Sequence, residues 1–466
     1  MKKKLSYWIV LLSLSGVSHA VDLIDIYQQS LENDPVFKQA YNTYLANAEA
    51  IPQAQAALYP QVTLKGLAGH NTLSVLGDFS GTGVLTDVSQ PYDSTQFQLY
   101  ASQAIFNYHA WSLIKQAKAS VKAAQAMFND SAQDLILRTS AAYFAILLAE
   151  DTLHFAESKK RANKRQLEQA RQRFQVGLDP ITSVYEARAA SDQSTAEVIS
   201  ARNDKINKSE SLRRLTNHVY DVISPLRNGR IPLVKPEPQN ADEWIATSLK
   251  QNYKFYAAKY KLDSSRENLK VQVSDNWPVL SLSSNLSTTS NSVNDTTGSN
   301  TSQTTSSFFI PNRKVTGYVA LSVNFPVYQG GLVQSKTRQA QYDYASSSEE
   351  LERIYRDVAV NSRIAYNTIM DGLSKVRADR QTVLSQKVSL ESIEAQFQVG
   401  TRTMVDVLDA QRKLFEVQRE LSKDQYGLIH AILNLKYLAG TLNVQDLEEI
   451  NSWLNTTRIN QFKPTK

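Results

Sequence analysis

The sequence contains no cysteine among its 466 residues. A chain without cysteine forms no disulfides and cannot carry the lipid that bacterial lipoproteins attach to an N-terminal cysteine. Beyond the N-terminus the chain also lacks any run of about 20 apolar residues, so we expect no membrane-spanning helix. Any attachment to a membrane must therefore come from the fold itself.

Groups suited to catalysis or metal binding are sparse. The histidines at positions 70, 109, 154, 218 and 430 are scattered and show no metal-ligand spacing. The sequence has no Gly-x-Ser-x-Gly motif, no phosphate-binding glycine loop and no cysteine nucleophile. It therefore predicts neither an enzyme nor a cofactor or metal site.

Residues 1–20 have the pattern of a secretory signal peptide. Lys2, Lys3 and Lys4 precede an apolar stretch, and Ser18-His19-Ala20 forms a small-x-small cleavage site. Removal of the three lysines lowers the net charge from +6 to about +3. This weak and dispersed charge gives no argument for a nucleic-acid partner.

The chain contains an internal repeat of roughly 220 residues. The run Phe-Gln-Val-Gly at 174–177 recurs at 397–400, and Pro60 matches Pro278 at a similar offset. We expect a first repeat at 21–223 and a second at 241–440. A proline-rich connector at 224–240 would join them, and a tail at 441–466 would follow.

Each repeat is predicted to contain one very long helix and one shorter one. Residues 107–174 and 331–397 contain almost no glycine or proline, so each reads as a helix of about 68 residues, roughly 100 Å long. Shorter helices are expected at 180–217 and 403–439, with apolar residues at coiled-coil spacing. Residues 22–58 should also be helical, with a break at 33–35 where Asp34 is a candidate N-cap.

Four segments alternate apolar and polar residues as half-buried strands do. They span 61–69, 95–106, 279–287 and 314–327. The polar loops expected at 70–94 and 287–307 interrupt the strands at the same place in both repeats. Each strand by itself also fits a soluble two-faced sheet, but paired strands with long polar loops favour a transmembrane β-barrel.

Four strands are too few to close a barrel, because about eight are needed even for a narrow one. Lipid offers no hydrogen-bond partner to an open strand edge. Insertion into a bilayer therefore requires several copies, two for eight strands or three for twelve. The sequence gives this lower bound and leaves the number open.

Three runs resemble the TolC family of outer-membrane efflux and type I secretion channels. They are FPVYQGGLVQSKTRQAQY at 325–342, VGTRTMVDVLDA at 399–410 and LAGTLNVQDL at 438–447. The resemblance implies a homotrimer with a twelve-stranded barrel in the outer membrane, continued by a twelve-helix coiled-coil tunnel into the periplasm. It implies passive export of drugs or secreted proteins. The implied partners are a periplasmic adaptor protein, an inner-membrane pump that is either proton-driven or of the ABC type, and outer-membrane lipid.

Asp406 and Asp409 are three residues apart and so share one face of a helix. The resemblance places them at the periplasmic aperture, where a trimer would carry two rings of three carboxylates. Carboxylates about 8 Å apart repel by roughly 2 kcal/mol at an effective dielectric of about 20, so the rings should attract cations and raise some of their own pKa values. Spacing alone favours a different interpretation, a capping box of Asp406 with Thr403, and the family resemblance reverses that preference.

The resemblance also implies a latch that holds the aperture shut. Arg402 matches the arginine that links neighbouring hairpins in the family, and Thr182 matches one of its partners. Two positions depart from the family pattern, because Ser183 replaces an aspartate and Phe397 replaces a hydrogen-bonding tyrosine. We therefore expect a closed state held more by packing and by Arg402–Thr182 than by charge.

Four glycines are interpreted as structural turns. Gly177 and Gly400 end helices where a positive φ is useful. Gly330 and Gly331 lie where the chain changes from strand to helix.

One alternative belongs to a different class: a periplasmic coiled-coil adaptor or structural spacer would share the long helical hairpins and the signal peptide. The four barrel-like strands and the lack of an anchoring cysteine argue against it.

Overall fold

The computed structural model describes residues 21–77, 83, 86–220, 222–293 and 312–455. The expected signal peptide at 1–20 lies outside these residues. The chain forms two compact units: unit 1 comprises Met1–Thr43, Ala126–Tyr256 and Arg353–Lys466, and unit 2 comprises Tyr44–Gln125 and Ala257–Glu352. Each unit draws on both sequence repeats.

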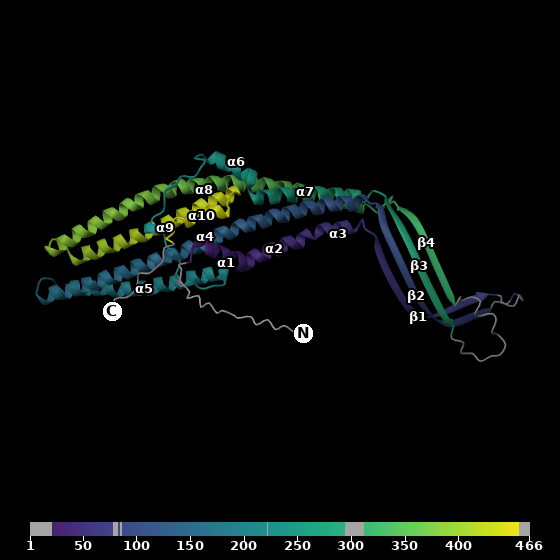
Figure 1. Ribbon diagram of the computed structural model, residues 1–466, viewed down its shortest axis with the longest axis horizontal. Helices are drawn as coiled ribbons and strands as arrows, with labels where there is room; N and C mark the ends of the chain where they lie inside the picture. The colour runs from purple at the N-terminus through teal and green to yellow at the C-terminus, as the bar shows by residue number, and fades with distance from the viewer. Residues whose placement is uncertain (1–20, 78–82, 84–85, 221, 294–311, 456–466) are drawn as a thin grey trace, which may run out of the picture. The chain divides into compact units, whose positions relative to one another are not determined.

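The helices follow the two-repeat plan (Figure 1). The first repeat contains α1 (Leu23–Asn33), α2 (Pro35–Ala48), α3 (Ala50–Ala56), α4 (Tyr108–Gln175) and α5 (Ile181–Thr216). After a short 3-10 turn at Arg227–Gly229, the second contains α6 (Ala241–Gln251), α7 (Tyr253–Ser274), α8 (Leu332–Gln398) and α9 (Met404–Ala439), and α10 (Val444–Asn451) follows. The four long helices begin and end within one residue of the predicted positions.

Unit 2 contains one antiparallel sheet in the order β1-β2-β3-β4 (Figure 1). Its strands are β1 (Gln61–Gly77), β2 (Thr86–Phe106), β3 (Val279–Val293) and β4 (Arg313–Asn324). The fold class, long helices with four strands, is confirmed. β2 and β3 pair with each other, so the sheet joins the two repeats.

The strand limits need correction. The polar loop expected at 70–94 is wrong over 70–77 and 86–94, and β3 continues through 293. In the first extension Leu73 and Leu76 fall on opposite faces of the strand, so no regular alternation of apolar and polar residues marks it. Cross-strand contacts such as His70–Asp93 at 2.7 Å accompany the backbone ladder. β4 ends before the predicted 327, since Pro326 has no N–H for the ladder. Residues 294–311 of the second loop lie outside the described part.

The register gives the sheet one apolar and one polar face. Leu64 pairs with Leu99, Leu99 pairs with Leu286, and Leu282 pairs with Leu321, so side chains of one kind form rows across the strands. The apolar face carries Val62, Leu64, Phe97, Leu99, Leu282, Leu286, Val315, Val319, Leu321 and Val323, each at least 40% exposed. On the opposite face polar side chains bond across strands, as in Gln98–Asn285 at 2.7 Å. The sheet thus presents a continuous exposed apolar surface.

Both outer strands of this sheet have a free edge. Within the part of the chain that the structure describes, β1 pairs only with β2 and β4 pairs only with β3. The sheet is therefore open on both sides.

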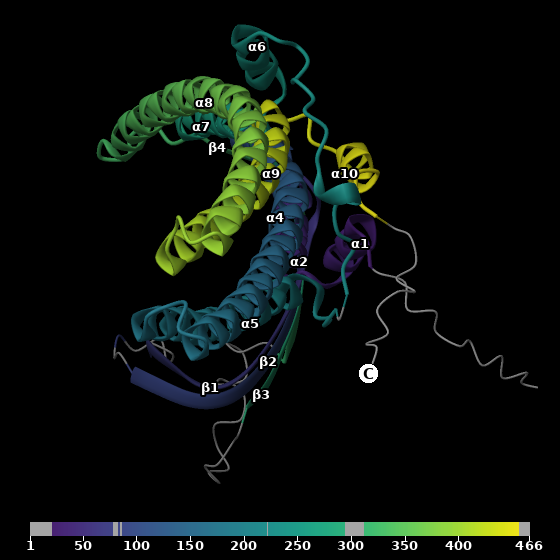
Figure 2. The ribbon, with the colours of Figure 1, turned by 90° about the vertical axis from the view of Figure 1, so that its left-hand side faces the viewer.

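Unit 1 is built from two helical hairpins (Figure 2). The C-terminal part of α4 packs along α5, with Lys159–Glu197 at 2.7 Å and Lys205–Glu150 at 2.8 Å between them. The C-terminal part of α8 packs along α9, where Lys375 contacts Asp424 at 2.9 Å. Each hairpin therefore contributes one long and one shorter helix.

One segment of α4 is long and apolar enough, by length and composition alone, to cross a membrane. This finding is against our expectation of no such helix. More than half of the apolar segment, 56%, is buried inside the protein. Tyr143 and Leu147 of α4 are both in the apolar core of unit 1. Core helices combine length and apolar character in the same way.

The helix breaks follow local chemistry that repeats in both halves. The Asp34 carboxylate accepts from the Phe37 N–H at 3.1 Å, and the Asn252 side chain accepts from the Phe255 N–H at 2.9 Å. Asp34 is therefore the predicted N-cap of α2, and Asn252 has the same role for α7. A second break at Glu49 was not predicted; Pro52 lacks the N–H that would bond the Ala48 carbonyl.

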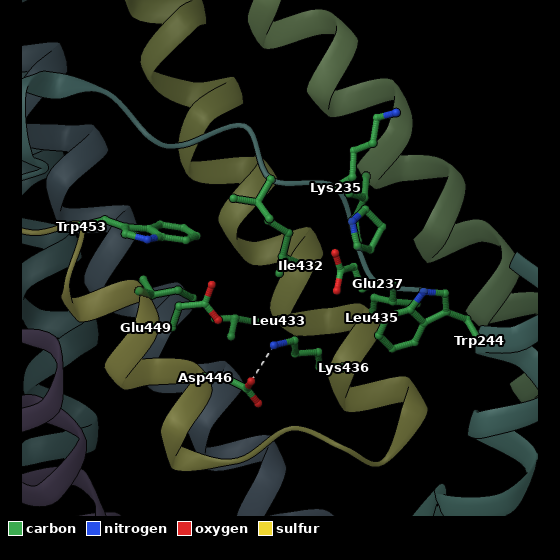
Figure 3. Close-up of a pocket in the computed structure, with 14 residues that line it drawn as sticks. Lys235, Glu237, Trp244, Ile432, Leu433, Leu435, Lys436, Asp446, Glu449 and Trp453 are labelled. Carbon is green, nitrogen blue, oxygen red and sulfur yellow. Dashed lines mark hydrogen bonds and ion pairs between the residues drawn. The ribbon is translucent and has the colours of Figure 1, made fainter. Parts of the chain in front are cut away.

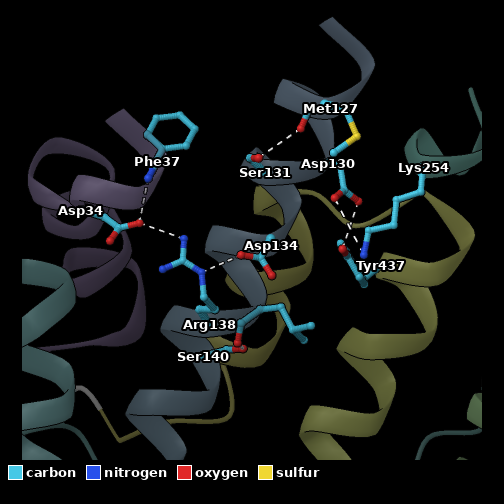
Figure 4. A network of polar contacts seen from close by, with 11 residues as sticks. Asp34, Phe37, Met127, Asp130, Ser131, Asp134, Arg138, Ser140, Lys254 and Tyr437 are labelled. Carbon is cyan, nitrogen blue, oxygen red and sulfur yellow. Dashed lines mark hydrogen bonds and ion pairs between the residues drawn. The ribbon is translucent and has the colours of Figure 1, made fainter. Parts of the chain in front are cut away.

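Two polar groups tie the surrounding elements to α4 (Figure 4). The Arg138 guanidinium donates to the Asp34 carboxylate at 2.8 Å and to Asp134 at 2.6 Å. A little earlier along the helix, Asp130 accepts from the Tyr437 hydroxyl at 3.0 Å. Burial raises the pKa of Asp130, and this is opposed by the nearby Lys254 and by the Tyr437 hydrogen bond.

The connector crosses the surface of unit 1 in an extended form. Tyr143 donates its hydroxyl hydrogen to the Ser224 carbonyl at 2.6 Å, and the Arg380 guanidinium donates to the Ile231 carbonyl at 2.8 Å. Between the connector and α6, α9 and α10 lies a cavity of about 240 Å³, with Trp244 and Trp453 on opposite sides (Figure 3).

We predict that Gly440→Ala destabilises unit 1 by about 3 kcal/mol. Gly440 ends α9 at φ +71°, and a Cβ there would lie 2.2 Å from the Gln251 carbonyl oxygen. The measurement is the midpoint of the heat-induced loss of helical circular dichroism. The matched control is Gly400→Ala, at φ +79° with no atom within 4 Å of its Cβ, which should cost only about 1 kcal/mol. Equal midpoints for the two variants would contradict the close contact at Gly440.

Candidate functional site

The turns at the ends of the two hairpins share one geometry. Gly177 adopts φ +77° and Gly400 adopts φ +79°. The Leu178 N–H donates to the Arg173 carbonyl at 2.9 Å, and the Thr401 N–H donates to the Gln396 carbonyl at 3.0 Å. Both are Schellman-type helix ends, in which glycine takes the left-handed conformation that other residues resist.

A small apolar cluster joins the four helix ends at these turns. Its buried members are Ala170 of α4, Ala187 of α5, Phe397 of α8, and Met404 and Val407 of α9. The two hairpins of one chain therefore pack against each other at their tips. Phe397, one of the predicted latch residues, lies inside this cluster and is 5% exposed.

Arg173 connects the first turn to the second hairpin. Its Nε and Nη2 atoms contact the two carboxylate oxygens of Asp179 at 2.9 and 3.3 Å, across the α4–α5 turn. Its guanidinium carbon lies 4.9 Å from the centre of the Phe397 ring. This distance is within the range of a cation–π contact.

Arg402 lies in the second turn and contacts its own hairpin. Its Nε donates to the Gln396 side-chain oxygen at 3.1 Å, and its Nη1 lies 3.7 Å from an Asp406 carboxylate oxygen. Within the single described chain no hydrogen bond joins Arg402 to Thr182. The Arg402 side chain is 49% exposed, so it remains accessible to another molecule.

The capping box at the start of α9 is present. The Thr403 hydroxyl accepts from the Asp406 N–H at 3.3 Å, and the Asp406 carboxylate accepts from the Thr403 N–H at 2.9 Å. Hydrogen bonds from the backbone and hydroxyl of Thr403, helped by Arg402, lower the pKa of Asp406. In a trimer, mutual repulsion of three such carboxylates would act against this effect.

Asp409 and the two remaining latch positions are less constrained. Asp409 pairs with Arg412 at 3.2 Å, and both side chains are more than half exposed. Thr182 is exposed and Ser183 is half-buried at the start of α5. The structure therefore brings Arg402 and Asp406 together and places Phe397 in the tip cluster, while Thr182 and Asp409 face outward.

Arg173 and Asp179 were missed by the sequence reasoning. A signal was available, because an arginine in the last turn of a helix and an aspartate six residues later can meet across a glycine turn. The contact with Phe397 joins residues 224 positions apart, and no local pattern indicates it.

The predicted glycine turn before α8 is present, and the described residues offer no metal site. Gly330 and Gly331 both take positive φ, +62° and +82°, just before α8. Among the residues described by the structure, no group of three histidine, aspartate or glutamate side chains is placed to hold a metal ion.

The model of the outer membrane efflux protein family matches residues 26–218 and 244–441. The chain belongs to this family. The two matched segments run close to the two repeats, with the connector between them. Resemblance to the TolC family is thereby confirmed.

Relatives and solved structures agree with this assignment. The outer membrane protein TolC of Escherichia coli strain K12 is 35% identical over 97% of this chain and 90% of its own length. The proteases secretion protein PrtF of Dickeya chrysanthemi is 26% identical over 98% and 97%. The crystal structure of the Campylobacter jejuni CmeC outer membrane channel superimposes with a TM-score of 0.73 at 15% identity, covering 98% of each chain.

The family and the fold together define the protein's class. It is an outer-membrane efflux or secretion channel, and its family consists of transport channels. The alternative of a periplasmic adaptor or spacer is not favoured.

Proposed function

We propose that three copies of this chain close one barrel in the outer membrane and form a passive export duct, gated at the hairpin tips. The open sheet carries this proposal. Within the described part of the chain it has free edges on β1 and β4 and ten exposed apolar side chains on one face. In a bilayer both edges must find partners, and β4 of one copy meeting β1 of the next satisfies both. Three copies give twelve strands.

The hairpins of unit 1 would line the periplasmic part of the duct. A passive duct needs an energised pump, so we propose an inner-membrane pump, proton-driven or of the ABC type, joined through a periplasmic adaptor protein. The cargo would be drugs or secreted proteins, chosen by that pump.

The assembly is tested on the mature protein purified in detergent. We predict a protein mass of three chains by light scattering and stepwise ion conductance in planar bilayers. Heating in dodecyl sulfate should reduce the complex to single chains. A water-soluble monomer without conductance would contradict the proposal.

At the aperture we propose two stacked carboxylate rings from Asp406 and Asp409. Both side chains are substantially exposed, 36% and 55%, and lie on one face at the start of α9. A threefold arrangement would bring like charges together and attract cations.

We predict that the double variant Asp406→Asn, Asp409→Asn loses most of the cation selectivity. The asparagine oxygen at 406 can still accept the capping hydrogen bond, so α9 should begin as before. The measurement is the reversal potential in a potassium chloride gradient, which should move toward zero. The control Glu391→Gln removes an exposed carboxylate from α8 and should leave the potential unchanged. An unchanged reversal potential in the double variant would contradict the placement of these carboxylates at the aperture.

For the latch we propose that Arg402 reaches Thr182 of a neighbouring protomer. We predict that Arg402→Ser raises the open probability of single channels by about tenfold, as expected for the loss of a hydrogen bond from a charged group, worth about 1.5 kcal/mol. The control is Arg188→Ser, which removes an exposed arginine of α5 with only a loose contact to Asp192 at 4.0 Å. Open probability equal to that of the unaltered protein would refute the latch.

A further inference from the structure

We propose that Arg173 is the positioning residue that couples the two helical hairpins of one protomer at their tips. This inference rests on the proposed aperture, because it assigns the link that makes each protomer's tip move as one body. The Arg173 guanidinium makes both contacts: it forms an ion pair with Asp179 and a cation–π contact with the Phe397 ring.

The ion pair fixes the orientation of the guanidinium. Two nitrogen atoms of Arg173 contact two oxygen atoms of Asp179, a bidentate arrangement that only arginine makes. The side chains are 20% and 12% exposed, so the pair is largely shielded from water and salt. Asp179 belongs to the turn between α4 and α5, so the pair also stiffens the first hairpin's end.

The cation–π contact between Arg173 and Phe397 links the first hairpin to the second. Phe397 belongs to the last turn of α8 and is almost fully buried, with the Arg173 guanidinium carbon 4.9 Å from its centre. A planar guanidinium attracts the ring electrostatically and covers its surface. The apolar cluster that contains Phe397 has five buried side chains, and four partly buried ones pack against it. Apolar contacts are not directional, so the guanidinium adds an orientation that the cluster does not supply.

The contact also replaces an interaction that this chain cannot make. The Phe397 ring carries no hydroxyl, so it cannot form with Ser183 the side-chain hydrogen bond that the resemblance implies. Arg173 joins the same two hairpins through Phe397 and needs no hydroxyl on the ring.

The test measures the distance between the two tips within one protomer. The chain has no cysteine, so Val176→Cys and Val399→Cys supply the only two labelling sites for spin labels, and both positions are at least 70% exposed. Labelled chains are diluted with unlabelled ones in full-length trimers, so that the distance distribution reports one protomer. The variants are Arg173→Gln and the control Arg171→Gln, which removes an exposed arginine two residues earlier.

We expect one narrow distance with Arg173 present and with Arg171→Gln. In Arg173→Gln, we expect the separated-tip population to rise by about fivefold, the effect of losing one partly shielded cation–π contact. Phe397→Leu should also raise the separated-tip population. Phe397→Tyr should leave it unchanged, since tyrosine keeps the aromatic ring. Asp179→Asn keeps Arg173 but removes its ion pair, so it should broaden the distance distribution less than Arg173→Gln does. This variant replaces Arg173→Gln in the test if Arg173→Gln fails to assemble.

An unchanged distance distribution in Arg173→Gln would overturn the inference, whatever the conductance. Bilayer recordings of the same variant separate this failure from that of the proposed function. A broader distribution with a raised open probability supports both the coupling and the aperture. A broader distribution with unchanged conductance supports the coupling and places the gate elsewhere.

Discussion

The structure depends on one constraint: a strand edge in lipid has no water to bond its N–H and C=O groups. Among the residues that the structure describes, the sheet of unit 2 has two such edges and an exposed apolar face. Its polar face is different, because Gln98 and Asn285 already bond each other across strands. In the proposed assembly, lipid covers the apolar face and neighbouring copies cover the edges. Assembly would then be required for insertion into the membrane.

Duplication explains why the local chemistry occurs twice. Asp34 and Asn252 cap equivalent helices, and Gly177 and Gly400 end equivalent long helices with nearly equal φ values. The helix starts that follow these glycines differ. α5 begins after Pro180 with no side-chain cap, whereas α9 begins with the Thr403–Asp406 capping box. The first turn is ordered instead by Arg173 and Asp179. Two repeats with one backbone plan have thus acquired different chemistry at the tips.

The sequence was informative wherever the determinant is local. The near absence of glycine and proline in residues 107–174 set the length of α4, and Asp34-Pro35 marked a helix break. Prediction failed where the determinant is shared between strands. The apolar residues Leu73 and Leu76 fall on opposite faces, so residues 70–77 show no regular alternation, and their pairing with 86–94 makes both segments strands. At the site, the capping box and the glycine turns were visible in the sequence. The approach of Arg173 to Phe397 was not, since it requires two hairpins to pack.

The tips are also where unit 1 is least able to resist movement. The main apolar core contains large, fully buried side chains from α1, α4, α8, α9 and α10, such as Tyr143, Ile369 and Leu433. The tip cluster is small and separate from it. Local opening costs least where few apolar contacts are buried, so a change in the hairpin ends leaves the main core intact. A polar link such as Arg173 with Asp179 suits that place, because it orients the two hairpin ends where little apolar area is buried.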